Sequence, residues 1–331
     1  MTAARMLGDS DADIAYAAHT LARGELLGLP TETVYGLAAD ALQPEAVAAV
    51  FKAKGRPANH PLIVHVASAS HVSEFAQNLP ACAQALMDAY WPGPLTLIFQ
   101  RRQGVAEAAA GGYPTIALRC PSHPLALKLL QCAWNLGVKG VAAPSANLFG
   151  KVSPTTAQHV QEAFPDLTVL DGGACQIGIE STIVDISQGR PVLLRPGMLQ
   201  VAQLSQLAGQ PVLRAQPEPS ASTPAAPGTL ASHYAPRAKV RLMDAATLHQ
   251  RLQALGVHAN NLGVWSRDVL LGAGAGVLWR QQSAQAETAA HDLFAVLRDL
   301  DARGVQQIWV ELPPDTPEWE GVRDRLQRAA A

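Results

Sequence analysis

Three arginines beside strand-like segments are the residues best suited to chemistry in this chain. Arg56 and Arg195 each stand immediately before a proline, and Arg119 ends the alternating segment 115–119. A guanidinium presents a planar fork of N–H donors that binds a carboxylate or a phosphate through two hydrogen bonds. Because the three arginines recur at the same kind of position, we expect them to meet at one sheet edge and to line a concave site for an anionic ligand.

Turns rich in hydroxyl groups and small residues stand beside other strand-like segments. Residues 30–36 read Pro-Thr-Glu-Thr-Val-Tyr-Gly and lie between an apolar run at 26–29 and a helix that begins at Pro44. Residues 142–147 end a strand with small side chains, and residues 178–185 lead from a glycine-rich turn into a strand. Small residues let a ligand approach the backbone, and hydroxyls donate to phosphate oxygens. These turns are the candidate walls of the site.

Each of these features also has an ordinary structural interpretation. Lys52 and Lys54 end a helix, where cations offset the helix dipole whether or not an anion binds nearby. His65 lies in an apolar strand and could be a core histidine with a satisfied partner. Arg119 could form a salt bridge with a neighbouring loop, and Ser153 could cap a helix that starts near residue 154. Whether these residues have a structural role or bind a ligand depends on whether they converge in the fold.

Composition narrows the class of protein. The chain has 331 residues, 48% of them hydrophobic, which is enough for two ordinary domains or one large one. Only 16% are charged and the formal net charge is -2, whereas a general nucleic-acid binder needs clustered lysine and arginine. The four cysteines form no CxxC pair, which favours free thiols in a reducing compartment over a zinc site. The sequence shows no apolar leader and no Walker A loop, and we expect a cytoplasmic protein.

The order of elements predicts two α/β units. Helical patterns at 14–26 and 72–90 and a helix from Pro44 alternate with apolar strands, which indicates one large sheet. Strands of this first unit are expected at 62–66, 95–99, 115–118, 141–143, 169–170, 182–186 and 192–194. Residues 214–232 are rich in Ala, Pro and Ser and are typical of a flexible linker. The second unit is expected to have strands at 239–242, 261–265, 276–279 and 306–311 and helices at 244–256, 284–303 and 319–328.

A glycine-rich run at 272–276 resembles a dinucleotide-binding loop. It lies between two apolar strand-like segments and opens no helix, whereas such a loop must lead into one. The sequence therefore does not predict a dinucleotide site there.

Taken together, the motifs resemble those of the Sua5/YrdC family, the threonylcarbamoyl-AMP synthases. They occur in the family's order within residues 11–236, and the tail resembles the extra domain of the longer Sua5-type members. The motifs that carry the resemblance are residues 30–36, 54–57, 144–147, 180–185, 194–197 and 232–236. The resemblance implies an α/β fold with a YrdC-like twisted mixed sheet and helices over 11–201. A linker and lid segment over 202–237 and a small Rossmann-like α/β domain over 238–331 would follow.

The resemblance also implies an activity. Members of the family are nucleotidyltransferases that condense L-threonine, bicarbonate or CO2 and ATP into threonylcarbamoyl-AMP and pyrophosphate. The product would pass to the tRNA threonylcarbamoyltransferase machinery for the t6A modification of adenosine 37, with indirect or weak tRNA contact and no membrane contact. Mg²⁺ would arrive with ATP and need no dedicated protein cage.

The family's ligand contacts can be carried over by position. Threonine contacts would fall on Thr33, His65, Arg119, the backbone of Ala143 and Ser181, with Arg119 holding the carboxylate. ATP contacts would fall on Arg56, His60, Thr115, Ser145, Ser153, Arg195 and Tyr234, with Lys52, Lys54 and Asn147 in support. No residue is expected to act as a nucleophile or as a general acid or base, because phosphoryl transfer depends mainly on positioning and charge neutralisation.

Two departures from the family pattern stand out. His60 occupies the position usually held by Asn, although an imidazole can also donate a hydrogen bond. Residues 227–230 read Pro-Gly-Thr-Leu and lack the Lys-Tyr pair of some members, which concerns the lid more than the pocket.

Three other functions remain open at this stage. A nucleic-acid-binding module would use the basic concavity without turnover. A carbamoyltransferase of the hydrogenase-maturation type would need zinc-finger cysteines and an acylphosphatase segment, and this sequence shows neither. A related protein with an inactive site would keep the fold without the chemistry.

Overall fold

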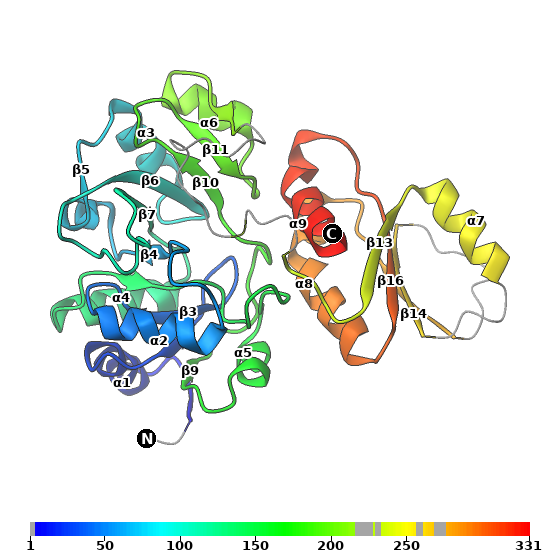
Figure 1. Cartoon of the computed structure of the whole chain (residues 1–331), viewed down its shortest axis with the longest axis horizontal. Helices are drawn as coiled ribbons and strands as arrows, with labels where there is room; N and C mark the ends of the chain where they lie inside the picture. Colours follow the sequence, from blue (N-terminus) through cyan, green and yellow to red (C-terminus); the bar gives the residue numbers. More distant parts are fainter. Residues whose placement is uncertain (1–3, 216–227, 229–232, 256–260, 268–275) are drawn as a thin grey trace.

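The fold was analysed in a computed structural model that describes residues 4–215, 228, 233–255, 261–267 and 276–331. Within these residues the chain forms two α/β parts, each built on its own sheet (Figure 1). Most of the predicted linker and of the glycine-rich run at 272–276 lies outside the described residues.

The larger sheet is mixed, with parallel and antiparallel neighbours. Its strands follow one another in space in the order β1 (Met6–Leu7), β9 (Val169–Leu170), β2 (Leu27–Leu29), β3 (Gly36–Asp40), β8 (Val141–Ala142), β4 (Ile63–His65), β7 (Thr115–Arg119), β6 (Leu95–Arg101), β10 (Thr182–Asp185), β11 (Val192–Arg195) and β12 (Leu213–Arg214), with β5 (Ala76–Gln77) beside β6. The helices of this part are α1 (Asp11–Ala22), α2 (Pro44–Lys54), η1 (Ala69–Glu74, a 3₁₀ helix), α3 (Ala81–Tyr90), α4 (Pro124–Asn135), α5 (Ala157–Ala163) and α6 (Val201–Ala208). The twisted mixed sheet predicted from the resemblance is confirmed.

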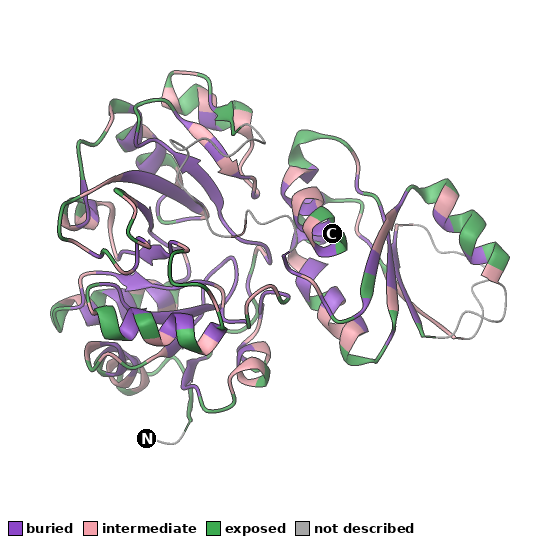
Figure 2. Cartoon of the chain, in the orientation of Figure 1, coloured by how far each residue is buried: buried purple, intermediate pink, exposed green. Residues whose placement is uncertain are grey.

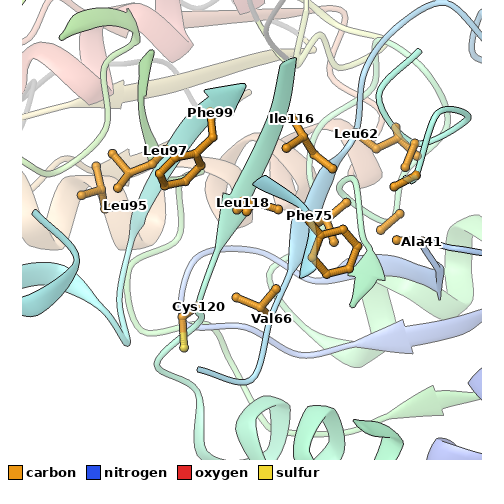
Figure 3. Close-up of a cluster of buried hydrophobic side chains, with 14 of the residues drawn as sticks. Ala41, Leu62, Val66, Phe75, Leu95, Leu97, Phe99, Ile116, Leu118 and Cys120 are labelled. Carbon is orange, nitrogen blue, oxygen red and sulfur yellow. The ribbon is translucent and has the colours of Figure 1, made fainter. Parts of the chain in front are cut away.

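Alternation along the central strands separates the core from the site. Leu95, Leu97 and Phe99 of β6 and Ile116 and Leu118 of β7 are buried in the main apolar cluster (Figure 3). Since successive side chains of a strand point to opposite faces, the residues between them face the other way. That second face of β7 ends in Arg119, and Figure 2 shows that the strands around it are buried.

The second part has a parallel sheet. Its strands run in the order β13 (Lys239–Met243), β16 (Gln307–Glu311), β14 (Leu262–Ser266) and β15 (Val277–Gln281), and all described pairs are parallel. Its helices are α7 (Ala245–Leu255), α8 (Ala286–Ala302), η3 (Pro317–Trp319, a 3₁₀ helix) and α9 (Glu320–Ala330). In Figure 1, α8 and α9 lie on the side of this sheet that faces the larger part, and α7 lies on the other side.

Several elements differ from the sequence predictions. The prediction of one continuous helix over 72–90 is confirmed only over its second part, α3: η1 ends at Glu74, β5 follows, and α3 begins only after Pro80. A proline lacks the N–H that a helix interior needs, so the helical period cannot continue through it. Ser153 is not a helix cap, because Thr156 accepts the hydrogen bond from the His159 N–H at the start of α5. The sequence also failed to reveal β3, which lies between residues 30–36 and α2.

The segment predicted as linker and lid contains regular structure. The helix α6 begins at Val201, and β12 pairs with β11, so the larger sheet extends beyond residue 201. The domain boundaries at residues 201 and 237 stay a prediction. No helix in the described part of the chain is long and apolar enough to cross a lipid bilayer.

Candidate functional site

A pocket of about 50 Å³ lies beside the ends of β4, β7, β8 and β11. It is lined by Thr31, Thr33, Val34, Gly36, Arg56, Ile63, His65, Arg119, Ala143, Pro144, Ser145, Glu180, Ser181, Arg195, Gly228, His233 and Tyr234. The three arginines singled out in the sequence are all among these residues. Of the twelve residues expected to contact threonine or ATP, nine line the pocket.

Strand register brings His65 and Arg119 together. The two residues are partners in the parallel pairing of β4 with β7, and both are buried. Arg119 donates from Nη1 to the Thr33 hydroxyl at 2.8 Å and from Nε to the Gly93 carbonyl at 3.2 Å. Its Nη2 lies 2.6 Å from Oε1 of Glu32, so the salt bridge considered as an alternative does form. A guanidinium has five N–H groups, and Arg119 therefore keeps donors for a ligand as well.

The protonation states of this half of the pocket follow from burial. Burial, with a smaller effect of Arg119, lowers the pKa of His65 to about 3, so the imidazole is neutral near pH 7. Burial opposes ionisation of Glu32, but Arg119 outweighs it and lowers the pKa of that carboxyl below its ordinary value. A neutral imidazole and a charged Arg–Glu pair thus stand side by side.

Arg195 and Ser181 form a second cluster in the lining. Arg195 donates from Nε and Nη2 to the Ser181 carbonyl at 3.1 and 3.0 Å, and from Nη2 to the Ser181 hydroxyl at 3.1 Å. The same hydroxyl lies 2.7 Å from Oγ1 of Thr96 on β6. These contacts hold Ser181 in one orientation at the pocket wall.

Arg56 comes from the loop after α2, where Gly55 ends the helix in the left-handed conformation. It donates from Nη2 to the Pro61 carbonyl at 3.0 Å, while its buried Nε has no hydrogen-bond partner among the described residues. Burial, together with the nearby charge of Arg195, lowers the pKa of Arg56 to about 10, which still leaves it protonated near pH 7. Two close guanidiniums favour an anion between them.

Residues of the segment predicted as a lid line the pocket beside these arginines. Tyr234 is fully buried with φ of 62°, and its ring lies 4.1 Å from that of His233. Gly228 has φ of 78°, and a Cβ there would collide with the Tyr234 hydroxyl and approach Arg195, so only glycine fits. Three members of this segment therefore occupy the pocket beside the arginines.

Buried polar atoms without partners gather at the pocket. Among the described residues, no hydrogen-bond partner is found for Nε of Arg56, Nδ1 of His65, Nδ1 of His233 or Oη of Tyr234. Such groups are rare in native proteins because each costs the free energy of its lost hydration. Four of them around one pocket indicate that a polar ligand completes their hydrogen bonds.

Three predicted ATP contacts lie outside the lining. Thr115 stands at the start of β7, on the same face as Arg119 but four residues earlier. His60 is partly buried, with its ring 5.7 Å from that of Phe149. Ser153 is fully buried and donates to Oε1 of Glu180 at 2.5 Å, so it reaches the pocket only through that carboxylate. Their contact with ATP stays a prediction.

The supporting residues also lie outside the lining. Lys52 is exposed on α2, whereas Lys54 is buried and donates to the carbonyls of Ser145 and Asn147 at 2.5 and 2.6 Å. Burial, reinforced by Arg56, holds the pKa of Lys54 well below its ordinary value. Asn147 donates to the carbonyls of Leu148 and Lys151. Lys54 and Asn147 thus shape the loop that carries Ser145.

Sequence reasoning missed Glu32, Glu180 and His233 as site residues, although each lies in a quoted motif. Glu32 and Glu180 each precede a predicted threonine-binding residue, Thr33 and Ser181, and this shared placement was the available signal. A carboxylate beside an anion site has no obvious use until its arginine partner is known, and the partner of Glu180 comes from the far end of the chain.

The described residues contain no cluster of three or more side chains suited to hold a metal ion. Glu180 is the one carboxylate in the described lining, and both its oxygens are engaged, by Ser153 and by Arg325. The arrangement therefore offers positive charge and oriented donors, which can bind and align an anion.

Comparison with known proteins identifies the relatives of this chain. The Sua5/YciO/YrdC family model, described as telomere recombination, matches residues 19–197, and the model for the C-terminal domain of threonylcarbamoyl-AMP synthase matches residues 199–331. Threonylcarbamoyl-AMP synthase of Pyrococcus abyssi is 37% identical over 326 residues, covering 96% of this chain and 94% of that protein. The Bacillus subtilis enzyme of the same name is 37% identical over 338 residues, covering 98% and 94%.

A solved structure agrees over the whole chain. P. abyssi Sua5 complexed with L-threonine superposes with a TM-score of 0.89 at 34% identity, covering 99% of this chain and 98% of that one. Matching family models over both parts, together with this identity over nearly the full length, show that the chain belongs to the Sua5/YrdC family, in the long form that carries the Sua5-type C-terminal domain.

Proposed function

We propose that this chain condenses L-threonine, bicarbonate or CO2 and ATP into threonylcarbamoyl-AMP, with release of pyrophosphate. The observation that carries the proposal is a set of four buried polar atoms, from Arg56, His65, His233 and Tyr234, that have no hydrogen-bond partner among the described residues. They surround one pocket that also holds Arg119 and Arg195. Their chemistry fits a ligand with several anionic and polar groups. The names of the full-length relatives supply the reaction that such a ligand undergoes.

The half of the pocket around His65 and Arg119 is the proposed threonine site. The relative from P. abyssi was solved in complex with L-threonine, and here Thr33, Ser181 and the Ala143 backbone lie in the same lining. In this proposal the free N–H groups of Arg119 bind the threonine carboxylate. A neutral His65 accepts or donates one hydrogen bond without adding charge beside the amine.

The half around Arg56 and Arg195 is the proposed nucleotide site. Arg56, Ser145, Arg195 and Tyr234 line it directly, and His60, Thr115 and Ser153 are the proposed contacts of the parts of ATP that extend further. A volume of about 50 Å³ is far below the several hundred Å³ of sites that enclose such ligands. The segment with His233 and Tyr234 must therefore move outward to admit ATP, and we propose that it acts as a lid.

The proposed reaction balances without a protein nucleophile. The threonine amine attacks the carbon of CO2 and loses a proton to give a carbamate. A carbamate oxygen then forms a bond to the α-phosphorus as the bond to the leaving pyrophosphate breaks in line. Arg56 and Arg195 would offset the charge that develops on the phosphates, and the closed lid would keep water from the labile mixed anhydride.

We propose that Mg²⁺ enters with the triphosphate. Mg²⁺ prefers oxygen ligands and keeps several waters, so phosphate oxygens and water can satisfy it. Because Ser153 and Arg325 already engage both oxygens of Glu180, the described lining offers no free carboxylate to it.

The product's fate is also a proposal. A mixed anhydride of a carbamate and AMP hydrolyses readily, so it must pass soon to the machinery that transfers the threonylcarbamoyl group to tRNA. We place the reaction in the cytoplasm, where ATP and threonine are available and where the free thiols of Cys82, Cys120, Cys132 and Cys175 stay reduced. Indirect or weak tRNA contact agrees with the near-neutral formal charge of -2.

The experiment that tests the function is pyrophosphate release from ATP by the full chain. Release that requires both L-threonine and bicarbonate supports the proposal. Pyrophosphate release that does not depend on threonine would indicate another acceptor. Salt-dependent RNA binding without pyrophosphate release would favour the alternative of a nucleic-acid-binding module.

A further inference from the structure

The last helix of the chain reaches the wall of the pocket. Arg325 of α9 is fully buried and donates from Nε to Oε2 of Glu180 at 2.7 Å. It also donates from Nη2 to the Glu180 carbonyl at 3.3 Å and from Nη1 to the Pro196 carbonyl at 2.9 Å. Its guanidinium lies 5.4 Å from the centre of the Tyr234 ring, within the range of a cation–π contact. One side chain of the second part thus touches three segments that surround the nucleotide half.

Glu180 transmits these contacts to the lining. Its Oε1 accepts the Ser153 hydroxyl at 2.5 Å, and its own backbone leads directly into Ser181. Arg325 binds the carbonyl of Glu180 and Arg195 binds the carbonyl of Ser181, so two arginines fix consecutive peptide groups. Burial disfavours the charged carboxylate, but Arg325, Arg195 and Ser153 outweigh it and lower the pKa of Glu180.

Close backbone packing holds α9 in this place. A Cβ at Gly321 would lie 2.5 Å from the Gly197 carbonyl oxygen and 2.9 Å from Cδ1 of Ile179, so a side chain there would push the helix away. On the neighbouring helix α8, Arg298 donates to the carbonyls of Val152 and Ser153 at 2.6 and 3.2 Å. Both ends of the Ser153–Glu180 hydrogen bond are therefore supported from the second part.

We propose that Arg325 is a positioning residue for the nucleotide half of the pocket: through Glu180 it holds Ser153 and the 180–181 backbone, and directly it braces Tyr234. The identity of the ligand as ATP rests on the proposed function. The assignment gives the C-terminal domain a role in the reaction, because the segments that its helices fix are those that meet the nucleotide.

The threonine half has a separate anchor, and this makes the role of Arg325 measurable. There Glu32 pairs with Arg119, and both residues come from the first part of the chain. Ser181 is the one proposed threonine contact in the segments that Arg325 holds. Loss of Arg325 should therefore weaken ATP binding far more than L-threonine binding. A side chain that merely stabilised the fold would affect both ligands alike.

The test is calorimetric binding of ATP and, separately, of L-threonine to the full chain carrying Arg325→Gln. We expect the dissociation constant for ATP to rise by about tenfold or more, or about 1.4 kcal/mol, with a clearly smaller rise for threonine, which depends on this region only through Ser181. Arg325→Lys keeps the charge opposite Glu180 and should recover part of the loss. Arg323→Gln is the matched control, since Arg323 lies on the same helix and pairs with Asp315 away from the pocket.

A double-mutant cycle tests whether Arg325 acts through Glu180. We expect the effects of Arg325→Gln and Glu180→Gln on ATP binding to be strongly non-additive, as for residues in direct contact. Additive effects in the cycle would overturn the proposal. So would unchanged ATP binding by a folded Arg325→Gln variant. An equal loss of affinity for both ligands, together with a lower unfolding temperature, would overturn it as well. If Arg325→Gln does not fold, Arg325→Lys decides by the same criteria.

The outcome is separable from that of the proposed function. If the wild-type chain binds ATP but releases no pyrophosphate with threonine and bicarbonate, the proposed function fails. The ATP affinity of Arg325→Gln still tests the positioning role of Arg325. If the wild type releases pyrophosphate as proposed and Arg325→Gln binds ATP with wild-type affinity, the function stands and the role of Arg325 fails.

Discussion

Arg119 at the end of β7 pairs with Glu32 in the loop after β2, with 2.6 Å between Nη2 and Oε1 and both side chains buried. The pair fixes the guanidinium so that its remaining donors are aligned beside His65 before any ligand arrives. Removing one partner of a buried ion pair leaves an uncompensated charge, so the two residues must be considered together.

Glu32→Gln should damage threonine use selectively. Because Arg119 loses its counter-charge and its fixed orientation, we expect KM for L-threonine to rise by about tenfold or more, with KM for ATP within about twofold. Steady-state kinetics with each substrate varied in turn measures this. Glu25→Gln, a carboxylate half exposed beside Arg23, is the control and should leave both constants unchanged. Equal effects on both substrates would contradict the division of the pocket into two halves.

Lys54 and Lys52 provide a matched pair on one helix. Lys54→Met leaves the carbonyls of Ser145 and Asn147 without their buried donor, so we expect a loss of about 2 kcal/mol in the free energy of unfolding. Lys52 is exposed, and Lys52→Met should change that free energy by less than about 0.5 kcal/mol. Denaturant unfolding of the two variants compares them. A large loss of ATP affinity in Lys52→Met would support the separate prediction that Lys52 adds positive potential near the phosphates of ATP.

Arg56 and Arg195 carry the charge of the nucleotide half. Arg56→Ala or Arg195→Ala should lower kcat/KM for ATP by about 100-fold, as expected when one electrostatic donor to a phosphoryl transition state is lost. The fold should remain intact by circular dichroism. Arg303→Ala, an exposed arginine paired with Asp299 on α8, should retain normal turnover. Near-normal turnover in both pocket variants would show that Arg56 and Arg195 do not have these roles.

Much of the fold and site could be predicted because the signals are local. Arg119 ends an alternating strand, and strand pairing then places it opposite His65. The proline after α2 and the small residues around Ser145 likewise mark where the chain turns toward a ligand. The resemblance to a family joined these local signals into one pocket, which single motifs could not do.

The rest depended on contacts that join distant residues. Arg325, the ion-pair partner of Glu180, lies 145 residues away on α9, and no sequence pattern near Glu180 predicts this pairing. Lys54 reads as a solvated helix end, yet packing of α2 buries its ammonium against the loop at Asn147. The predicted helix over 72–90 extended too far toward its N-terminus for a different reason: apolar residues at helical spacing masked the break before Pro80.

Buried histidine makes stability depend on pH. The pKa of His65 is lowered by burial to about 3, whereas an unfolded histidine titrates near 6.5, so the unfolded chain takes up a proton that the folded chain refuses. Stability should therefore fall as pH drops from about 6.5 toward 3, by up to about 1.4 kcal/mol per pH unit for this residue. His65→Gln should show a shallower fall in unfolding free energy over this range than wild type.

The central claim is that one pocket joins threonine, carbon dioxide and the adenylyl group. The most direct measurement is mass spectrometry of the nucleotide products formed by the full chain from ATP, L-threonine and ¹³C-labelled bicarbonate, quenched within seconds. The account predicts an adenylate that carries one threonine and one labelled carbon, and that disappears when Arg119 or Arg195 is replaced by alanine. An unlabelled threonyl-adenylate, or AMP and pyrophosphate formed equally without threonine, would contradict it.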